Sequence, residues 1–268
     1  MMSVSRFAGR AYPMGRKVIA IVQARMGSSR LPGKSLERIG NWQLIDLVLH
    51  RTTNAKLVDK VVLATTVNPL DDVLENHVSN LGFEVYRGSE EDVLSRFYYA
   101  AKRHNPEAVV RVTGDCPLIS PFLIDSAVAC FLEKNVDYLA LSIGEEKLLA
   151  FPRGLDVEVA GFSSLRDAFK NAKEKYEREH VTPYLYTRDE HTKYYIKPSA
   201  EESRPKYRFC VDTARDLEMI RCIYSHFGNR LLDVEVDEII EFLDRNPGVV
   251  EINQGVRQKH YKEVDERY

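Results

Sequence analysis

The stretch KVIAIVQARMGSSRLPGK, residues 17 to 34, joins a short apolar run to a cationic loop. Residues 17 to 22 do not alternate between apolar and polar side chains, which is typical of a strand that is buried on both faces of a sheet. Three cations follow within ten residues, around a Gly-Ser-Ser turn: Arg25, Arg30 and Lys34. In open α/β sheets ligands bind beyond the carboxyl ends of the strands, and this loop has that place after the first strand.

The loop has the composition of an anion site. Gly27 and Ser28 begin a turn whose backbone N–H groups can point at one anion. Arg25 and Arg30 offer forked donors that match phosphate oxygens, and Lys34 adds a compact positive charge. The loop matches neither G-x-x-x-x-G-K-[ST] nor G-x-G-x-x-G, so it is neither a P-loop nor a dinucleotide-binding fingerprint. The pattern favours phosphate binding, with an ordinary solvated loop as the alternative.

The composition is that of an ordinary globular protein. The 268 residues are 44% hydrophobic and 29% charged, and the formal net charge is −2. We therefore expect neither general nucleic-acid binding nor membrane-surface binding, and any anion site must be local. The four cysteines lack C-x-x-C spacing, which predicts free buried thiols in a reducing compartment. No apolar run reaches the roughly 18 residues that span a bilayer.

The first residues do not have the pattern of a secretory signal. Residues 1 to 16 contain arginine and serine but lack the apolar core of a secretory signal. We expect a flexible N-terminal extension before the first strand, and a cytoplasmic protein.

Strand and helix patterns alternate five times in the first half of the chain. The expected strands cover residues 17 to 22, 60 to 66, 83 to 86, 108 to 113 and 136 to 141. The expected helices cover residues 44 to 55, 69 to 80, 90 to 103 and 121 to 134. This spacing suits right-handed crossovers between parallel strands and predicts an α/β fold.

The regularity breaks at about residue 145. There the patterns predict strands at residues 155 to 160, 193 to 198 and 207 to 211, and helices at residues 163 to 175, 213 to 227 and 236 to 243. No repeat or flexible linker separates the halves, so we predict a single domain over residues 17 to 268. Its nucleotide-binding half covers residues 17 to 142, and residues 143 to 268 bind the acceptor and complete the sheet.

The motif A-R-x-G-S-x-R-L-P-x-K, read at residues 24 to 34, resembles the nucleotide-binding signature of cytidylyltransferases that make CMP-activated sugar acids. The resemblance continues through RGSEEDVLSRF (87–97), VRVTGDCPLI (110–119), FPRGLDVEV (151–159), REHVTPY (178–184) and RFCVDTARDLEMI (208–220). The chain is most similar to the spore coat polysaccharide biosynthesis branch, and more distantly to the CMP-acylneuraminate and CMP-3-deoxy-manno-octulosonate synthetases. The resemblance implies a Rossmann-like nucleotide-diphospho-sugar transferase fold, a mostly parallel mixed sheet flanked by helices, with one antiparallel strand.

Two aspartates are the candidate metal ligands. Asp115 follows the fourth expected strand in T-G-D-C-P, which by itself is common turn chemistry. The resemblance implies that Asp115 holds Mg²⁺ against the nucleotide phosphates, and hard carboxylate oxygens suit that ion. Asp212 ends one expected strand and opens a helix, so either it or Thr213 could simply cap that helix. The resemblance makes Asp212 the second Mg²⁺ ligand and leaves Asp216 as an acidic residue of the first turn.

The second half supplies the candidate acceptor residues. Asp156 and Glu158 are two apart on an expected strand, so both side chains lie on one face. That face is either solvated, or it contacts the acceptor or lies near the metal, and Arg153 is available for an acidic group of the acceptor. The resemblance places Glu179 and His180 in an acceptor-side or dimer-contact segment. The other histidines have no ligand spacing, so zinc is not expected.

The remaining nucleotide contacts come from the ends of the first three strands. The resemblance implies that the loops after the second and third strands read the cytosine and ribose, which selects Ala64, Thr65 and Arg87. At the end of the first strand, Ala24 opens the signature that continues through Gly27.

The resemblance therefore implies a Mg²⁺-dependent nucleotidyltransferase that uses CTP and a small acidic acceptor. Its expected catalytic residues are Arg25, Lys34, Asp115 and Asp212. One alternative is a glycosyltransferase of similar fold, although such enzymes usually carry Asp-x-Asp where this chain has Asp115 followed by Cys116. Another is a nucleotide-binding homologue without turnover. Homodimers are common among the relatives, but the sequence itself shows no interface.

Overall fold

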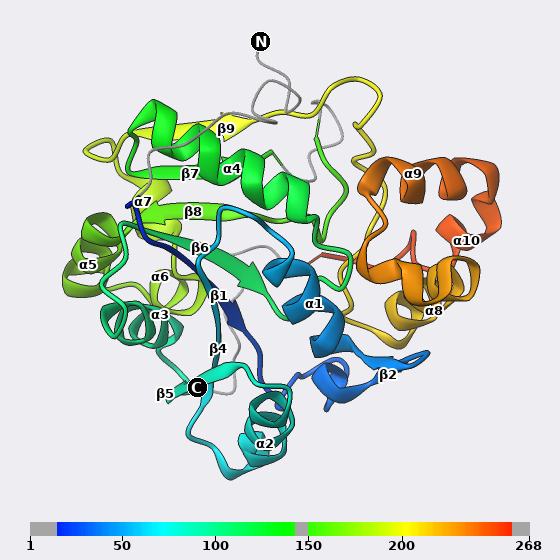
Figure 1. Ribbon diagram of the computed structural model, residues 1–268, viewed down its shortest axis with the longest axis horizontal. Helices are drawn as coiled ribbons and strands as arrows, with labels where there is room; N and C mark the ends of the chain where they lie inside the picture. Colours follow the sequence, from blue (N-terminus) through cyan, green and yellow to red (C-terminus); the bar gives the residue numbers. More distant parts are fainter. Residues whose placement is uncertain (1–14, 143–149, 259–268) are drawn as a thin grey trace.

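The computed structural model describes residues 15–142 and 150–258, so residues 1 to 14 of the expected N-terminal extension lie outside the described part. A seven-stranded sheet has the strand order β5-β4-β1-β6-β8-β7-β9 (Figure 1). Its strands are β1 (Val18–Gln23), β4 (Lys60–Thr66), β5 (Glu84–Gly88), β6 (Ala108–Thr113), β7 (Tyr138–Leu141), β8 (Glu158–Gly161) and β9 (Lys193–Ile196). Neighbouring strands are parallel except at β8, which runs antiparallel to β6 and β7. The predicted α/β fold with one reversed strand is confirmed.

Helices cover both faces of this sheet (Figure 1). One buried cluster packs the sheet against α1 (Leu44–Thr53), α2 (Asp72–Asn80), α4 (Pro121–Lys134), α8 (Ala214–Phe227) and α9 (Val236–Arg245). The other cluster packs it against α3 (Val93–Lys102), α5 (Phe162–Asn171) and α7 (Pro183–Thr187). The remaining elements are α6 (Lys175–His180), α10 (Pro247–Glu251) and a hairpin of β2 (Arg38–Ile39) and β3 (Trp42–Gln43).

The first strand explains why the opening apolar run does not alternate. Val18, Ala20 and Val22 belong to one buried cluster, and Ile19 and Ile21 belong to the other. Each of these five side chains is at most 1% exposed. Both faces of β1 are therefore core, as the sequence predicts for a central parallel strand.

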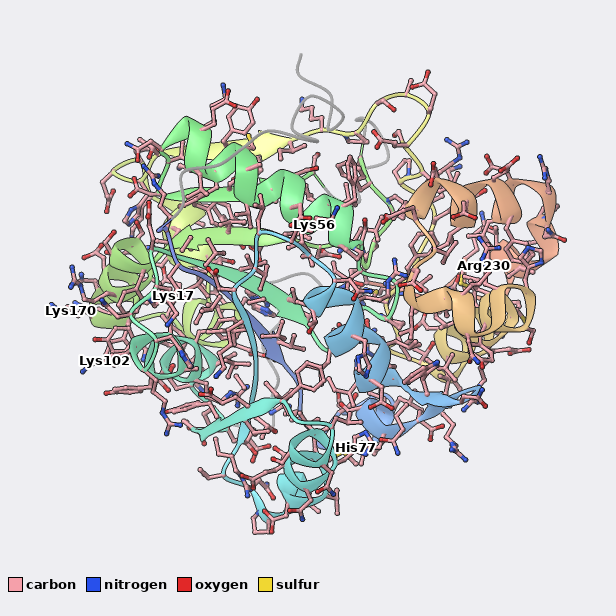
Figure 2. The ribbon with its side chains drawn as sticks, in the orientation of Figure 1. Lys17, Lys56, His77, Lys102, Lys170 and Arg230 are labelled. Carbon is pink, nitrogen blue, oxygen red and sulfur yellow. The ribbon has the colours of Figure 1, made fainter. Side chains whose placement is uncertain are left out.

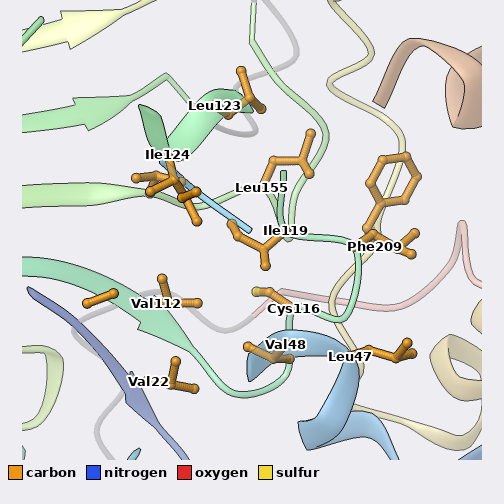
Figure 3. Packing of buried hydrophobic residues seen from close by; sticks show 14 of the residues in the cluster. Val22, Leu47, Val48, Val112, Cys116, Ile119, Leu123, Ile124, Leu155 and Phe209 are labelled. Carbon is orange, nitrogen blue, oxygen red and sulfur yellow. The ribbon is translucent and has the colours of Figure 1, made fainter. Parts of the chain in front are cut away.

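The two halves of the chain share the larger cluster. Figure 3 shows Val22 and Val112 of the central strands close to Leu47 and Val48 of α1. Leu155 and Phe209, from the second half of the chain, belong to the same cluster.

Arg51 is a buried link between these parts. It is fully buried, and its guanidinium donates to three carbonyl oxygens: Ile119 at 2.7 Å, Leu231 at 2.6 Å and Val234 at 2.9 Å. Burial lowers the pKa of Arg51 to about 10, because the charged form has lost water. One side chain on α1 thus joins the loop before α4 to the segment before α9.

The expected strand at residues 207 to 211 is wrong. That segment forms only an isolated bridge, between Arg153 and Arg208. Its backbone donors are divided between two loops, because Phe209 N–H donates to Arg153 and Val211 N–H donates to Asp115. The expected strand at residues 155 to 160 is shorter than predicted, since β8 begins at Glu158.

Two further features follow from the described residues. All four cysteines are free, and Cys116, Cys130 and Cys210 are buried, as predicted, but Cys222 is only half-buried. Among the helices in residues 15–142 and 150–258, none combines the length and the apolar character that crossing a membrane requires.

Candidate functional site

The loop after β1 is closed by its own backbone. The N–H groups of Ser28 and Gly33 both donate to the carbonyl oxygen of Met26 at 2.9 Å. Gly33 has φ +77°, a left-handed conformation that favours glycine, and a 3₁₀ helix (Lys34–Leu36) begins directly after it. This turn directs Lys34 back toward the sheet edge.

The ammonium of Lys34 lies between two carboxylates. Its Nζ is 2.9 Å from Asp115 Oδ2, 3.0 Å from Asp212 Oδ1 and 2.7 Å from the carbonyl oxygen of Val211. Burial alone would lower the pKa of Lys34, but the two aspartates raise it above its ordinary value. Burial alone would likewise raise the pKa of Asp115, but the Lys34 ammonium holds it below the ordinary value. Both groups are therefore charged at neutral pH.

Asp212 is not the cap of α8. Its Oδ2 instead accepts from the guanidinium of Arg30 at 2.9 Å and from that of Arg208 at 2.5 Å. The cap is Thr213, which exchanges hydrogen bonds with Asp216 in a capping box. Asp216 is the acidic residue of the first turn, as predicted, and the Asp212 carboxylate is left to bind three cations.

Gly114 brings Asp115 close to the loop after β1. Its N–H donates to the carbonyl oxygen of Gln23 at 2.8 Å. A Cβ atom at this position would lie 2.7 Å from both Ala24 Cβ and Gln23 O, so only glycine fits. Asp115 follows at once, and its carbonyl oxygen accepts from Val211 N–H at 2.8 Å.

The other residues expected to bind nucleotide lie around this loop. Arg25 is 3.4 Å from Glu90 Oε1, and an added Cβ on Gly27 would be 3.7 Å from the same oxygen. Ala64 and Thr65 are fully buried at the end of β4, where the Ala64 carbonyl oxygen accepts from Ala24 N–H.

Arg87 does not contact the cluster around Lys34, because its guanidinium binds the loop after β4 and the helix that follows it. Its guanidinium donates to the carbonyl oxygens of Thr66 at 2.7 Å and Asn68 at 2.8 Å. It also pairs with Asp72 at 2.6 Å and Glu75 at 2.7 Å. In the structure Arg87 holds the loop after β4 in shape.

Asp156, one of the expected acceptor residues, lies close enough to Asp115 for their charges to interact. Asp156 accepts from the N–H of Gly154 at 2.7 Å, and burial raises the pKa of its carboxyl group. The charges of Arg153 and Asp115 both act on this carboxyl. Within residues 15–142 and 150–258, the half-buried guanidinium of Arg153 has neither a hydrogen bond nor an ion pair.

Glu158 is engaged by the protein itself. It pairs with Arg111 on β6 and accepts from Tyr138 Oη at 2.5 Å and Thr182 Oγ1 at 2.6 Å. Thr182 N–H in turn donates to the carbonyl oxygen of His180 at 2.8 Å, across Val181 at φ +70°. This three-residue turn is rare and strained. It joins the end of α6, with Glu179 and His180, to the Glu158 side chain.

The donor set around Lys34 fits Mg²⁺. No group of three or more histidine, cysteine, aspartate or glutamate side chains in the described ranges could hold a metal by itself. Mg²⁺ needs no such group, since one or two carboxylates with phosphate and water usually suffice. Asp115, Asp212 and the Val211 carbonyl oxygen already surround a cation at 2.7 to 3.0 Å.

The cluster around Lys34 is separate from a pocket of about 330 Å³ in the C-terminal part. That pocket is lined by Tyr207, Leu243, Asp244, Pro247, Val250, Glu251 and Gln254. It contains none of the predicted site residues, so we assign it no part in the chemistry.

Sequence reasoning misses Arg208 as a partner of Asp212. The residue is only 6% exposed, and it binds Asp212 four positions later in the chain. The spacing in R-F-C-V-D is the signal, but the expected strand at residues 207 to 211 would place positions 208 and 212 too far apart for this contact.

Comparisons with known proteins show the family of the chain. The model of a family described as "Cytidylyltransferase" matches residues 19–239. The chain is 41% identical to the uncharacterized protein MJ1063 of Methanocaldococcus jannaschii, over 93% of this chain and 100% of that protein. It is 37% identical to the spore coat polysaccharide biosynthesis protein SpsF of Bacillus subtilis, over 86% and 95% of the two chains.

A more distant relative and a solved structure extend the comparison. The chain is 25% identical to the 3-deoxy-manno-octulosonate cytidylyltransferase of Solibacter usitatus, over 84% of this chain and 90% of that protein. It superposes on the structure of a cytidylyltransferase from Leptospira borgpetersenii with a TM-score of 0.81 and 32% identity. That match covers 91% of this chain and 100% of the other.

Proposed function

Because this chain belongs to the cytidylyltransferase family, we propose that it transfers CMP from CTP to a small acidic acceptor and releases pyrophosphate. One observation carries the proposal: Asp115 and Asp212 hold a cation between them, beside the cationic loop that ends at Lys34. Paired carboxylates next to a cluster of cations suit a triphosphate and its metal ion.

The two carboxylates would hold Mg²⁺. When bound, the ion supplies positive charge that neutralises phosphate oxygens. Asp115 and Asp212 are preorganised for it, since each already binds a cation and neither carries out helix capping.

The cations of the loop would bind the triphosphate. An acceptor oxygen forms a bond to the α-phosphorus while the bond from that phosphorus to the bridging oxygen of the β-phosphate breaks. Arg25, Arg30 and Lys34 would stabilise the negative charge that moves onto the departing pyrophosphate. The chain needs no covalent intermediate for this reaction, because positioning and charge neutralisation supply most of the rate.

Arg153 supports an acidic acceptor. Arg153 is half-buried and its charge acts on Asp156, but its guanidinium makes no hydrogen bond or ion pair within the described ranges, so its donors can match a carboxylate with two parallel hydrogen bonds. Two relatives point the same way: one is named for 3-deoxy-manno-octulosonate and the other for a spore coat polysaccharide. We therefore propose a sugar acid destined for surface polysaccharide as the acceptor, in a cytoplasmic and homodimeric enzyme.

A pyrophosphate-release screen tests this function. The protein is incubated with Mg²⁺, each of CTP, UTP, ATP and GTP, and a panel of acidic sugars with neutral sugars as controls. We expect pyrophosphate from CTP and at least one sugar acid, and a CMP conjugate of the matching mass. Release with neutral sugars alone would contradict the acidic acceptor. The cytidylyltransferase proposal would fail if no acceptor releases pyrophosphate and CTP does not raise the melting temperature.

A further inference from the structure

Two arginines hold the same oxygen of Asp212. The NH2 nitrogens of Arg30 and Arg208 lie 2.9 Å and 2.5 Å from Asp212 Oδ2. The NH1 nitrogen of Arg30 is 3.4 Å from the carbonyl oxygen of Arg257, and that of Arg208 is 2.5 Å from Gln258 Oε1. Two consecutive residues therefore contact both of the cations that neutralise this oxygen.

The rest of Arg208 is also fixed. Its Nε donates to Asp216 Oδ1 at 2.9 Å. Asn253, which is only 2% exposed, donates its side-chain amide to the same Asp216 oxygen at 3.0 Å and to the carbonyl oxygen of Arg208 at 2.9 Å. A buried arginine that is bonded through Nε and both terminal nitrogens has one available orientation.

Residues 252–258, which we call the C-terminal strap, lie beyond the part matched by the family, which ends at residue 239. In Figure 1 the strap, in red, runs from α10 back toward the end of β6. It thus brings residues from outside the common family region to the edge of the sheet where Asp115 and Asp212 lie.

We propose that the C-terminal strap is a positioning element of the site. Asn253 and Gln258 fix Arg208, the Arg257 carbonyl oxygen fixes Arg30, and the two guanidinium groups orient Asp212 so that Oδ1 faces Lys34. The strap acts through the arginines, so its members are positioning residues and not catalytic ones. The proposal rests on the proposed function, because that function gives Asp212 its role toward metal and phosphate.

A point variant with a matched control tests the strap. Gln258→Ala removes the acceptor of Arg208 NH1, whereas Gln254→Ala changes an exposed glutamine of the same strap that lines the separate pocket. Gln258→Glu keeps an acceptor oxygen and should rescue the contact. Electron paramagnetic resonance measures the affinity of the CTP complex for Mn²⁺. The kcat and the melting temperature of each variant are measured separately.

We expect Mn²⁺ affinity to fall about 10-fold in Gln258→Ala, since partners that orient metal ligands usually contribute 10- to 100-fold. The melting temperature should stay close to that of the wild type, because Gln258 is exposed. Gln258→Glu and Gln254→Ala should bind Mn²⁺ like the wild type. A purely structural role would instead lower the melting temperature without a change in metal affinity.

A second measurement needs no ligand. Chains that end at residue 255 or 258 differ only in Val256, Arg257 and Gln258, and hydrogen exchange is followed at Asp212 and Thr213. The N–H groups of these two residues donate to Asp216 Oδ2 at 3.0 and 2.8 Å. We expect faster exchange in the shorter chain.

Equal exchange rates in the two chains, together with wild-type metal affinity in Gln258→Ala, would overturn the proposal that the C-terminal strap positions the site. Failure of the proposed function has a different signature, namely a wild-type protein that neither binds CTP nor releases pyrophosphate. The exchange comparison would still test the strap in that case.

Discussion

Lys34 Nζ lies 3.0 Å from Asp212 Oδ1, although the two residues are 178 positions apart. Lys34 comes at the end of the loop after β1, and Asp212 directly precedes the cap of α8. The contact is possible because Val211 N–H donates to the carbonyl oxygen of Asp115 and so brings the second half of the chain to the sheet edge. Removing one member of such a buried pair leaves an uncompensated charge, so a substitution of either member should lower the free energy of unfolding, even where the fold stays intact, as well as change the chemistry.

Lys34→Met should lower kcat more than CTP affinity. The ammonium makes charge-assisted bonds, and each is worth roughly 1.5–3 kcal/mol, so we expect kcat to fall by about 10- to 100-fold. If Lys34 acts on the leaving pyrophosphate, the Kd for CTP should change less than kcat. Lys102→Met is the control, because Lys102 lies on α3 at the outer edge of the molecule (Figure 2). If both variants have the same kcat and the same Kd for CTP, the loop is an ordinary solvated loop that does not bind the triphosphate.

Asp212→Asn should abolish most turnover and leave the fold intact. Thr213 caps α8, so the substitution does not remove a cap, and asparagine keeps the shape of the side chain. It does remove the charge that binds Lys34, Arg30 and Arg208. Pyrophosphate release at limiting Mg²⁺ is the measurement, with circular dichroism to verify the fold. Near-normal release from the folded variant would refute the two-carboxylate site.

Gly114→Ala should separate the two loops that form the site. The new Cβ would lie 2.7 Å from Ala24 Cβ and Gln23 O, so backbone must shift. We expect kcat to fall at least 10-fold and the melting temperature to drop by several degrees, in line with overpacking costs of about 1–3 kcal/mol. Gly248→Ala is the matched control, since an added Cβ there meets nothing within 4 Å. Wild-type turnover in Gly114→Ala would contradict the close approach of these loops.

Arg51→Met should be among the costliest substitutions for stability. It leaves three carbonyl oxygens without a donor in the core, at about 1 kcal/mol or more each, so the free energy of unfolding should fall by about 3 kcal/mol or more. Urea denaturation measures the loss. Arg245→Met removes an exposed pair with Glu241 and should cost under about 0.5 kcal/mol. Similar losses in the two variants would mean that the Arg51 contacts carry little energy.

Acid should destabilise the protein partly through Asp115. The folded-state pKa of this carboxyl is below its ordinary value, because the Lys34 ammonium outweighs the effect of burial. Its contribution to stability is therefore fully present above the unfolded pKa of about 4, and is lost as the pH falls through the folded pKa. The melting temperature of the wild type should drop between about pH 4 and about pH 2, the range between the unfolded and folded pKa values of Asp115, and less so in Asp115→Asn. Asp156, whose pKa is raised by burial and also by the charge of Asp115, contributes with the opposite sign, and Asp115→Asn weakens that opposing contribution as well. Parallel melting curves for the two proteins would contradict the assignment.

The sequence predicts the first half of the sheet well because four of its five strands are largely buried on both faces. Apolar runs predict β1, β4, β6 and β7 to within two residues at each end, and the half-buried edge strand β5 is predicted to the same precision. The same rule misleads at residues 207 to 211, where Phe209 and Val211 are buried but pair with loops. Short elements such as α6, α7 and α10, of five or six residues, are too brief for a periodic pattern.

Some residues of the candidate site can likewise be predicted from the sequence, and others cannot. Asp115 and Lys34 are predicted from their positions after strands, since parallel strands deliver their loops to one edge. Asn253 and Gln258 leave no such signal, because they meet Arg208 from 45 and 50 positions away through packing of the C-terminal part. Arg87 has a suitable position near the carboxyl end of β5, but its hydrogen-bond donors are used by the loop after β4.

The ammonium between Asp115 and Asp212 has a thermodynamic consequence. Lys34, Arg30 and Arg208 carry three positive charges, which the three negative charges of Asp115, Asp212 and Asp216 balance. In the proposed reaction, a triphosphate that draws Lys34 and Arg30 toward itself leaves the carboxylates undercompensated and raises their affinity for Mg²⁺. Linkage then requires the reverse, that Mg²⁺ raises the affinity for the nucleotide by the same factor, so that the two ligands enter as a cooperative pair.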